Sequence, residues 1–325
     1  MARKPAKNRI NKLADVAELY FIEGLTQAEI SKKIGVTRSM VSRMLTEARE
    51  EGIVKIKIER KFKYDTALQT AMIKKFNLED AVIYNGQPEE YENYLTHLGV
   101  AGARIVRSYL REGLILGTAW GTTLNATINA LELDKQFCDI KIVQLAGALG
   151  ERNLAIDGHA LVYRLVSKLG GEAYYLHVPY IVDKQETVDS LLNVQGISET
   201  MEMMKECDLG IFGIGSVELD YSTFFNAGYL VLEEMQGLSI HGAVGNVCGL
   251  FFNIQGEPTA RDFQARALTI SRRDLFKIPT RIGIAGGSGK ISAILGALRG
   301  RYINVLVTDD ITASEVLRLA NEDQK

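Results

Sequence analysis

Two glycine-rich turns carry residue types that can hold a phosphate group. The first is Gly117-Thr118-Ala119-Trp120-Gly121-Thr122-Thr123 and the second is Ala285-Gly286-Gly287-Ser288-Gly289-Lys290. Each follows an apolar run and precedes a helical pattern, so each can offer backbone amides and hydroxyls at a helix N-terminus. Lys290 would add a point charge. Neither turn has P-loop or dinucleotide-turn spacing. The alternative is that these glycines only make tight turns between strand and helix.

A second polar group lies on one face of a helix predicted from residue 37 to about residue 51. Thr37 is the expected N-cap, and at helical spacing Val41, Met44, Leu45 and Ala48 share one side. The other side carries Arg38, Ser39, Ser42, Arg43 and Thr46. Two arginines and three hydroxyls on one face can contact phosphates and base edges.

The elements before this face give it a recognisable context. Thr26-Gln27-Ala28-Glu29 is a capping box that starts a short helix, and Gly35 ends it. A helix, a short turn and a second helix are typical of a helix-turn-helix, whose second helix enters the major groove. Residues 53–58 alternate apolar residues with Lys55 and Lys57, which predicts a strand, the wing, that touches the DNA backbone. The alternative is a three-helix bundle with a solvated polar face.

Charge is distributed unevenly along the chain. Residues 1–61 contain 14 Lys and Arg against 8 Asp and Glu, a net charge of +6, whereas the remaining residues carry −8. A basic head on an acidic body favours a polyanion as the partner of the head.

Organisation along the 325 residues indicates an α/β protein with more than one domain. We predict a winged helix-turn-helix over residues 1–60, a linker helix over 61–79 and an effector domain over 80–325. In this last part, strands are expected at 81–84, 114–119, 140–145, 173–178, 209–214, 281–285 and 303–308. Helices are expected between them at 91–111, 122–131, 158–169, 289–299 and 312–320. This alternation predicts a doubly wound, mostly parallel sheet with ligands at the carboxyl ends of its strands.

Composition excludes several other classes of protein. No apolar run is long enough for a membrane span, and the N-terminus lacks the apolar region of a secretion signal. Cys138, Cys207 and Cys248 lack CxxC spacing, and the four histidines lack metal-ligand spacing. We therefore expect a cytoplasmic protein with no membrane partner, no cofactor and no metal.

The order of these motifs resembles the SorC family of sugar-responsive bacterial regulators. The resemblance lies in residues 120–123, 143–147, 208–216, 242–252, 286–290 and 306–309, and in residues 25–31 and 39–43 of the head. It implies an effector domain folded like ribose-5-phosphate isomerase and glucosamine-6-phosphate deaminase. It also implies a phosphorylated sugar or sugar alcohol as effector, double-stranded operator DNA as partner, and a homotetramer or homodimer.

The resemblance also assigns residues to the effector site. Gly121, Thr122 and Thr123 would line the phosphate end, with Lys290 and the loop Gly287, Ser288 and Gly289 nearby; Gly147, Ser216 and Asn246 complete the set. Position 246 is usually acidic in this family, so Asn246 keeps an oxygen acceptor but loses a charge. Residues 144–147 also depart from the usual Gln-Leu-Asn-Gly, because Leu145 and Ala146 remove a polar side chain.

Two functions from different classes follow from these observations. The first is a transcriptional regulator of a carbohydrate-utilisation operon, not an enzyme, whose DNA binding is controlled by the phosphorylated sugar. The alternative is a sugar-phosphate isomerase or deaminase with a nucleic-acid-binding adaptor, although no motif nominates its acid and base. Lys141 is a weaker candidate for a Schiff base with the sugar, and His177 and Asp183 are weaker candidates for ligand contact.

Overall fold

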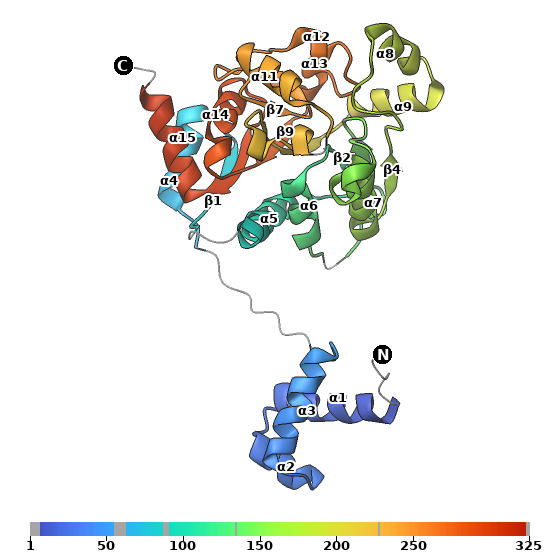
Figure 1. Cartoon of the computed structure of the whole chain (residues 1–325), viewed down its shortest axis with the longest axis vertical. Coiled ribbons are helices and arrows are strands. Elements are labelled where there is room, and N and C mark those ends of the chain that lie inside the picture. Colours follow the sequence, from blue (N-terminus) through green and yellow to red (C-terminus); the bar gives the residue numbers. More distant parts are fainter. Residues whose placement is uncertain (1–6, 55–62, 87–90, 134, 227, 323–325) are drawn as a thin grey trace. The chain divides into compact units, whose positions relative to one another are not determined.

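The computed structural model describes residues 7–54, 63–86, 91–133, 135–226 and 228–322. The chain divides into two compact units, Met1–Lys61 and Phe62–Lys325 (Figure 1). No helix among the described residues is long and apolar enough to cross a membrane.

The first unit is built from three helices, α1 (Lys7–Phe21), α2 (Gln27–Ile34) and α3 (Arg38–Glu50). Their core contains Leu13, Val16, Ile30, Val41 and Leu45, all buried. Thr26 and Glu29 form the predicted capping box of α2, in which the Thr26 amide donates to Glu29 Oε2 at 2.8 Å. Gly35 ends α2 with a φ of 70°, a left-handed conformation that suits glycine.

The segment after α3 departs from the predicted wing where it is described. Ile53 and Val54 are not in a strand. The Val54 amide instead donates to the Ala48 carbonyl at 3.0 Å, and both side chains pack against the helix core. Lys55 and Lys57 lie outside the described residues, so their part of the wing stays a prediction.

The second unit contains a seven-stranded parallel sheet in the order β1-β10-β9-β5-β2-β3-β4. Its strands are β1 (Asp80–Tyr84), β2 (Ile115–Thr118), β3 (Lys141–Gln144), β4 (Glu172–Tyr174), β5 (Leu209–Gly213), β9 (Thr280–Ile284) and β10 (Val305–Asp309). Strand β4 is shorter than the predicted 173–178. Past Tyr174 the chain pairs with a loop instead, since the Ala148 amide donates to the Val178 carbonyl at 2.8 Å.

Helices cover both faces of this sheet (Figure 1). Residues that alternate along a strand enter different cores: Ala81 and Ile83 join one, and Val82 and Tyr84 join the other. On the Val82 side lie α5 (Tyr91–Tyr109), α6 (Thr122–Ala130) and α7 (Gly158–Leu169); on the Ala81 side lie α4 (Thr66–Phe76), α9 (Gln195–Met204), α14 (Ile291–Arg299) and α15 (Asp310–Glu322).

The predicted linker helix belongs to the body of the second unit. Helix α4 packs on β1 and α15, and Met72 at its centre is fully buried. Lys75 Nζ also donates to Asn321 Oδ1 of α15 at 2.6 Å. The apolar stripe that predicted this helix is thus covered by the sheet, which is why the helix does not act as a free spacer.

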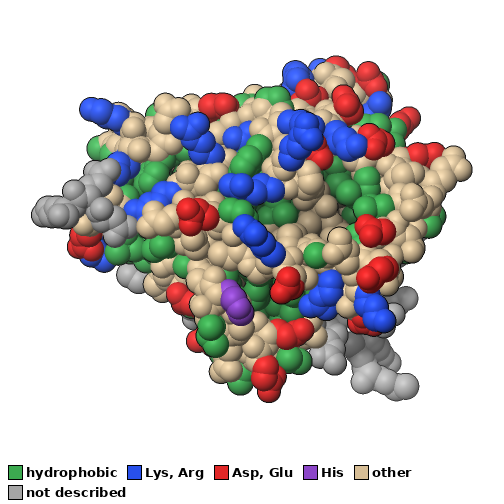
Figure 2. Space-filling model, turned by 90° about the horizontal axis from the view of Figure 1, so that it is seen from above, with side chains coloured by type: hydrophobic (Ala, Val, Ile, Leu, Met, Phe, Trp, Pro, Cys, Tyr) green, Lys and Arg blue, Asp and Glu red, His purple; other side chains and the backbone are tan. Residues whose placement is uncertain are grey.

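The surface drawn in Figure 2 mixes the two signs of charge. Lys and Arg side chains are interspersed there with Asp and Glu side chains. This face therefore lacks the field of one sign that would attract a polyanion.

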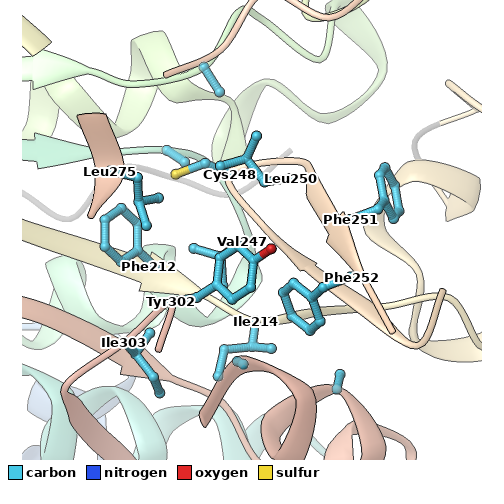
Figure 3. Close-up of a cluster of buried hydrophobic side chains, with 14 of the residues drawn as sticks. Phe212, Ile214, Val247, Cys248, Leu250, Phe251, Phe252, Leu275, Tyr302 and Ile303 are labelled. Atoms are coloured by element: carbon cyan, nitrogen blue, oxygen red, sulfur yellow. The ribbon is translucent and has the colours of Figure 1, made fainter. Parts of the chain in front are cut away.

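The segment that lies between β5 and β9 in the sequence forms a small antiparallel sheet, which was not predicted. It consists of β6 (Gly215–Ser216), β7 (Gly245–Val247) and β8 (Leu250–Phe252). Cys248 and Gly249 make the β7–β8 turn with φ values of 52° and 73°, as a two-residue hairpin turn requires. This sheet packs on the core of the Ala81 side, where the rings of Phe252 and Tyr302 lie 4.5 Å apart (Figure 3).

The remaining elements are short or lie at the edge of the body. They are the helices α8 (Gln185–Leu192), α10 (Thr223–Asn226), α11 (Leu232–Ile240), α12 (Arg261–Gln264) and α13 (Arg272–Leu275) and the 3-10 turns η1 (Glu151–Ile156), η2 (Leu219–Tyr221) and η3 (Ser288–Lys290).

Candidate functional site

A cavity of about 210 Å³ lies at the carboxyl ends of the central strands. Strands β2, β3 and β4 follow one another in one direction across the sheet, whereas β5, β9 and β10 follow one another in the other. The winding therefore reverses between β2 and β5, and the crevice at such a point is where open α/β sheets bind ligands. The segments after β2, β5 and β9 all contribute to the wall.

The turn after β2 places an uncapped helix N-terminus in this wall. Gly121, Thr122 and Thr123 all line the cavity. Gly121 has a φ of 139° and no side chain caps the amides of α6. Its own amide donates to the Ile156 carbonyl at 3.1 Å, which ties the turn to η1. The first turn of α6 is therefore open to an anionic or hydrogen-bond-accepting group.

The turn after β9 contributes less than its glycine content predicted. Of residues 286–290, only Gly286 and Lys290 line the cavity. The Gly287 amide donates instead to Thr312 Oγ1 at 2.8 Å. A side chain on Gly289 would come within 2.1 Å of the Tyr221 ring. Ser288 is exposed, with its Oγ 3.4 Å from Tyr221 Oη. Gly287, Ser288 and Gly289 thus shape the turn from outside the cavity.

Lys290 lies in the cavity wall with its charge unbalanced by an ion pair. Its Nζ donates to the Tyr221 carbonyl at 3.1 Å, and none of the ion pairs among the described residues includes it. Burial lowers the pKa of Lys290 to about 8, with Glu218 acting in the opposite direction. An anion in the cavity would supply the missing counter-charge.

Asn246 reaches the cavity, whereas Gly147 and Ser216 do not line it. Asn246 is buried, and a side chain on Gly215 would come within 2.4 Å of its amide. The Gly147 carbonyl accepts from Trp120 Nε1 at 3.2 Å, behind the cavity wall. Ser216 Oγ accepts from the Glu218 amide at 3.1 Å. Gly147 thus supports Trp120, which lines the cavity, whereas Ser216 supports Glu218, which does not line it.

The cavity also has lining residues that the sequence did not single out. They are Tyr94, Leu95, Leu98, Ile156, Asp220, Tyr221, Thr223, Phe224, Asn226 and Cys248, besides residues within or next to the glycine-rich turns. Tyr94, Leu95 and Leu98 come from the first two turns of the amphipathic helix α5, and the others come from short elements and turns. The Trp120 and Phe224 rings meet at 4.9 Å and form an apolar wall.

The weaker candidates lie elsewhere. Lys141 is the first residue of β3, at the amino edge of the sheet and away from the cavity, so the fold does not support a Schiff base there. His177 and Asp183 do not line the cavity either. His177 Nδ1 lies 3.1 Å from Nε2 of His159, near the exposed Tyr163. Across the described residues, no group of three or more His, Cys, Asp or Glu is placed to hold a metal ion.

Helix α3 of the first unit presents the predicted polar face. Arg38, Ser39, Ser42, Arg43 and Thr46 are all exposed, while Val41, Leu45 and Ala48 are buried behind them.

The α3 N-terminus and its arginines remain available to a partner. Thr37 caps α3 by accepting from the Met40 amide at 3.3 Å, and its hydroxyl lies 3.0 Å from that of Ser39. Within the described part of the chain, Arg38 and Arg43 form no ion pair, so both guanidinium groups are free to contact phosphates or bases.

Comparison with known proteins covers both units. Residues 60–318 match the family model described as "Putative sugar-binding domain", and residues 13–51 match the model "Sigma-70, region 4". The sorbitol operon regulator of Klebsiella pneumoniae is 29% identical over 310 residues, which are 95% of this chain and 98% of the relative. The transcriptional regulator YjhU of Escherichia coli is 31% identical over 307 residues, 92% of each chain.

A further relative and a solved structure agree with these matches. The deoxyribonucleoside regulator of Bacillus subtilis is 28% identical over 92% of this chain and 95% of its own. The crystal structure of the full-length K. pneumoniae sorbitol operon regulator SorC superposes with a TM-score of 0.72 at 29% identity, covering 96% of this chain and all of that one. These relatives are named as regulators, so the comparison does not support the isomerase or deaminase alternative.

Proposed function

Because the chain belongs to the SorC family of DNA-binding transcriptional regulators, we propose that its cavity binds a phosphorylated sugar or sugar alcohol that controls operator binding by α3. The observation that carries this proposal is the pairing of an uncapped α6 N-terminus with an ammonium group that forms no ion pair with the described residues. Both line one cavity at the switch point of the sheet.

The phosphate would lie against Gly121, Thr122 and Thr123, with Lys290 as its counter-charge. Backbone amides and hydroxyls supply the geometry and the lysine supplies the charge. Asn246 offers one acceptor and two donors to the sugar. The apolar wall of Trp120 and Phe224 suits the carbon face of such a ligand.

Operator DNA would be read by the exposed face of α3. Arg38 and Arg43 can each reach a guanine or a phosphate, and the three hydroxyls can contact the backbone. Lys55 and Lys57 would add backbone contacts. We propose a cytoplasmic homodimer or homotetramer, because a pair of heads related by a twofold axis reads a palindromic operator.

A thermal-shift screen of the full chain tests the effector. The probes are sugars and sugar alcohols with and without a phosphate group. At a hundred times its dissociation constant, a bound phosphosugar stabilises the folded state by about 2.7 kcal/mol, which raises the melting temperature by several degrees. Lys290→Met should weaken binding by roughly ten- to a hundredfold, since a charge-assisted hydrogen bond is lost. Lys141→Met is the matched control and should behave as the parent chain.

A DNA-binding assay tests the role of α3. Arg43→Ala should weaken operator binding by about 1–3 kcal/mol if the residue reads a guanine, with little change on random DNA. Equal losses on both would make it a phosphate contact. The exposed Arg318 of α15 is the matched control, and Arg318→Ala should leave DNA binding unchanged.

No phosphosugar shift at all in the thermal-shift screen would overturn the effector proposal while leaving the DNA result intact.

A further inference from the structure

The hydroxyl of Tyr94 stands at the end of the cavity formed by α5 and the turn after β9. Tyr94 lines the cavity beside Gly286, and a side chain on Gly286 would come within 2.1 Å of Tyr94 Oη. The hydroxyl donates to Asp309 Oδ2 at 2.7 Å. The Tyr84 ring packs on the Tyr94 ring with centroids 6.3 Å apart, which helps to fix its orientation.

The carboxylate that accepts from Tyr94 is itself held rigidly. Asp309 is buried, at 4% exposure. Its Oδ1 accepts from the Thr312 amide at 2.7 Å, and its Oδ2 also accepts from Thr312 Oγ1 at 2.6 Å. Thr312 Oγ1 in turn accepts from the Gly287 amide at 2.8 Å. One chain of hydrogen bonds therefore runs from the turn after β9 through Thr312 and Asp309 to the phenol.

This series of hydrogen bonds fixes which group donates and which accepts at each step. Thr312 Oγ1 must donate to Asp309, because a carboxylate can only accept, and it accepts the Gly287 amide through a lone pair. Burial, and secondly the Asp309 charge, raise the pKa of Tyr94, so the phenol keeps its proton. Since that proton points at Asp309 and Tyr84 also hydrogen-bonds the phenol, Tyr94 can offer only a lone pair to the cavity.

The first turn of α6, unlike the Tyr94 hydroxyl, offers donors to the cavity. The first turn of α6 follows β2, whereas Gly286 follows β9, and β5 lies between these two strands. Two strand spacings separate the turns by about 10 Å. Amides stand at the β2 side and an acceptor backed by a buried carboxylate stands at the β9 side. Lys290, at the end of the turn after β9, also lines the cavity as a donor, so on this side the acceptor character is local to the Tyr94 hydroxyl.

Resting on the proposed function, we propose that Tyr94, held by Asp309, accepts a hydrogen bond from a hydroxyl of the ligand and excludes a second phosphate from that end. The effector is then a sugar monophosphate with a free hydroxyl remote from its phosphate. A phosphate at this end would set its oxygens against the lone pairs of Tyr94 with the Asp309 charge behind them.

Matched mono- and bisphosphates test this specificity by calorimetry on the full chain. The pairs are fructose 6-phosphate with fructose 1,6-bisphosphate, glucose 6-phosphate with glucose 1,6-bisphosphate, and ribulose 5-phosphate with ribulose 1,5-bisphosphate. The parent chain should prefer the monophosphate at least tenfold. Tyr94→Phe should weaken monophosphate binding about three- to tenfold, the effect of one lost neutral hydrogen bond. Tyr163→Phe, at an exposed tyrosine outside the cavity, should change nothing.

Asp309→Asn provides a readout that a purely structural role would not give. The amide nitrogen of asparagine would donate to Tyr94 Oη, so the phenol proton would turn toward the cavity. Preference should then shift toward the bisphosphate by tenfold or more.

The possible outcomes separate the two proposals. Monophosphate binding that ignores Tyr94→Phe, or a parent chain that binds both members of a pair equally, would overturn the specificity proposal alone. Binding of none of the phosphosugars here or in the thermal-shift screen would overturn the proposed function and this inference with it.

Discussion

At the scale of the residue, Lys290 makes ligand binding depend on pH. Burial lowers its pKa to about 8, so above that pH the empty cavity holds mostly the neutral amine. A sugar phosphate stays dianionic there, since its second pKa is about 6, and it favours the protonated lysine. Binding then requires proton uptake, and affinity should fall by up to about tenfold per pH unit as the pH rises above 8.

Calorimetry from pH 7 to 9.5, in two buffers of different ionisation enthalpy, measures both the fall and the proton taken up. Lys290→Met should bind more weakly but lose this pH dependence, while Lys141→Met should keep the slope of the parent chain. A slope that survives in Lys290→Met would assign the titration to another group.

Individual site residues also show what could and could not be predicted about the site from the sequence. Gly121, Thr122, Thr123, Asn246 and Lys290 all line the cavity, and their contact with a ligand stays a prediction. Gly147 does not line it, because its missing side chain makes room for the Pro179 carbonyl, 2.6 Å from where a Cβ would lie. A motif cannot separate a glycine required by backbone packing from one required by a ligand.

Tyr94 was missed for a related reason. Its partner Asp309 is 215 positions away in the sequence, and within α5 it looks like one aromatic residue of an amphipathic helix. Only the parallel pairing of β1 with β10 brings the two segments together.

At the scale of the element, long apolar runs were predictable and short strands were not. All seven strands of the parallel sheet fall within or next to their predicted ranges, since strands buried on both faces are continuously apolar. Strands β6, β7 and β8 have only two or three residues each, too few to show alternation. The segment around α8 and α9 likewise gave no prediction, although Ile197 and Met204 are buried on one face of α9.

The capping box gives an element-scale prediction for the first unit. Thr26→Ala removes the oxygen that accepts from the Glu29 amide and one donor to Glu29 Oε2. Loss of an N-cap costs about 1 kcal/mol, so backbone amides of α2 should exchange hydrogen about fivefold faster. Ser31→Ala is the control, because that hydroxyl donates only to the Ala28 carbonyl of the same helix. Unchanged exchange in Thr26→Ala would mean that α2 is held by its core contacts alone.

At the scale of the whole molecule, the charge pattern of the sequence agrees with the division of the chain into two units. The net charge of +6 on residues 1–61 and of −8 on the rest follows the division into two units. A positive unit is attracted to DNA, whereas the negative body could hold the proposed anion only through local donors, for which the first turn of α6 and Lys290 are the candidates. Sequence placed the helix before β1 in a linker because its periodicity does not reveal which surface covers it.

Regulation requires a coupling free energy between effector binding in the second unit and operator binding in the first unit. If the effector changes operator affinity by some factor, the operator must change effector affinity by the same factor, typically five- to 150-fold. We expect this reciprocity whether the effector releases or tightens DNA. It is measured by titrating labelled operator with the chain at several phosphosugar concentrations, and by calorimetry of the phosphosugar with and without saturating operator.

Variants separate this coupling from loss of either site. Lys290→Met should abolish the effect of phosphosugar on DNA while keeping the operator affinity of the ligand-free chain within about twofold, because Lys290 lies in the second unit. Arg43→Ala should weaken operator binding but leave phosphosugar affinity in the absence of DNA unchanged. In a closed cycle of two sites, the two titrations must give the same factor. Unequal factors at one protein concentration would therefore show that the ligand also changes the number of chains in the complex.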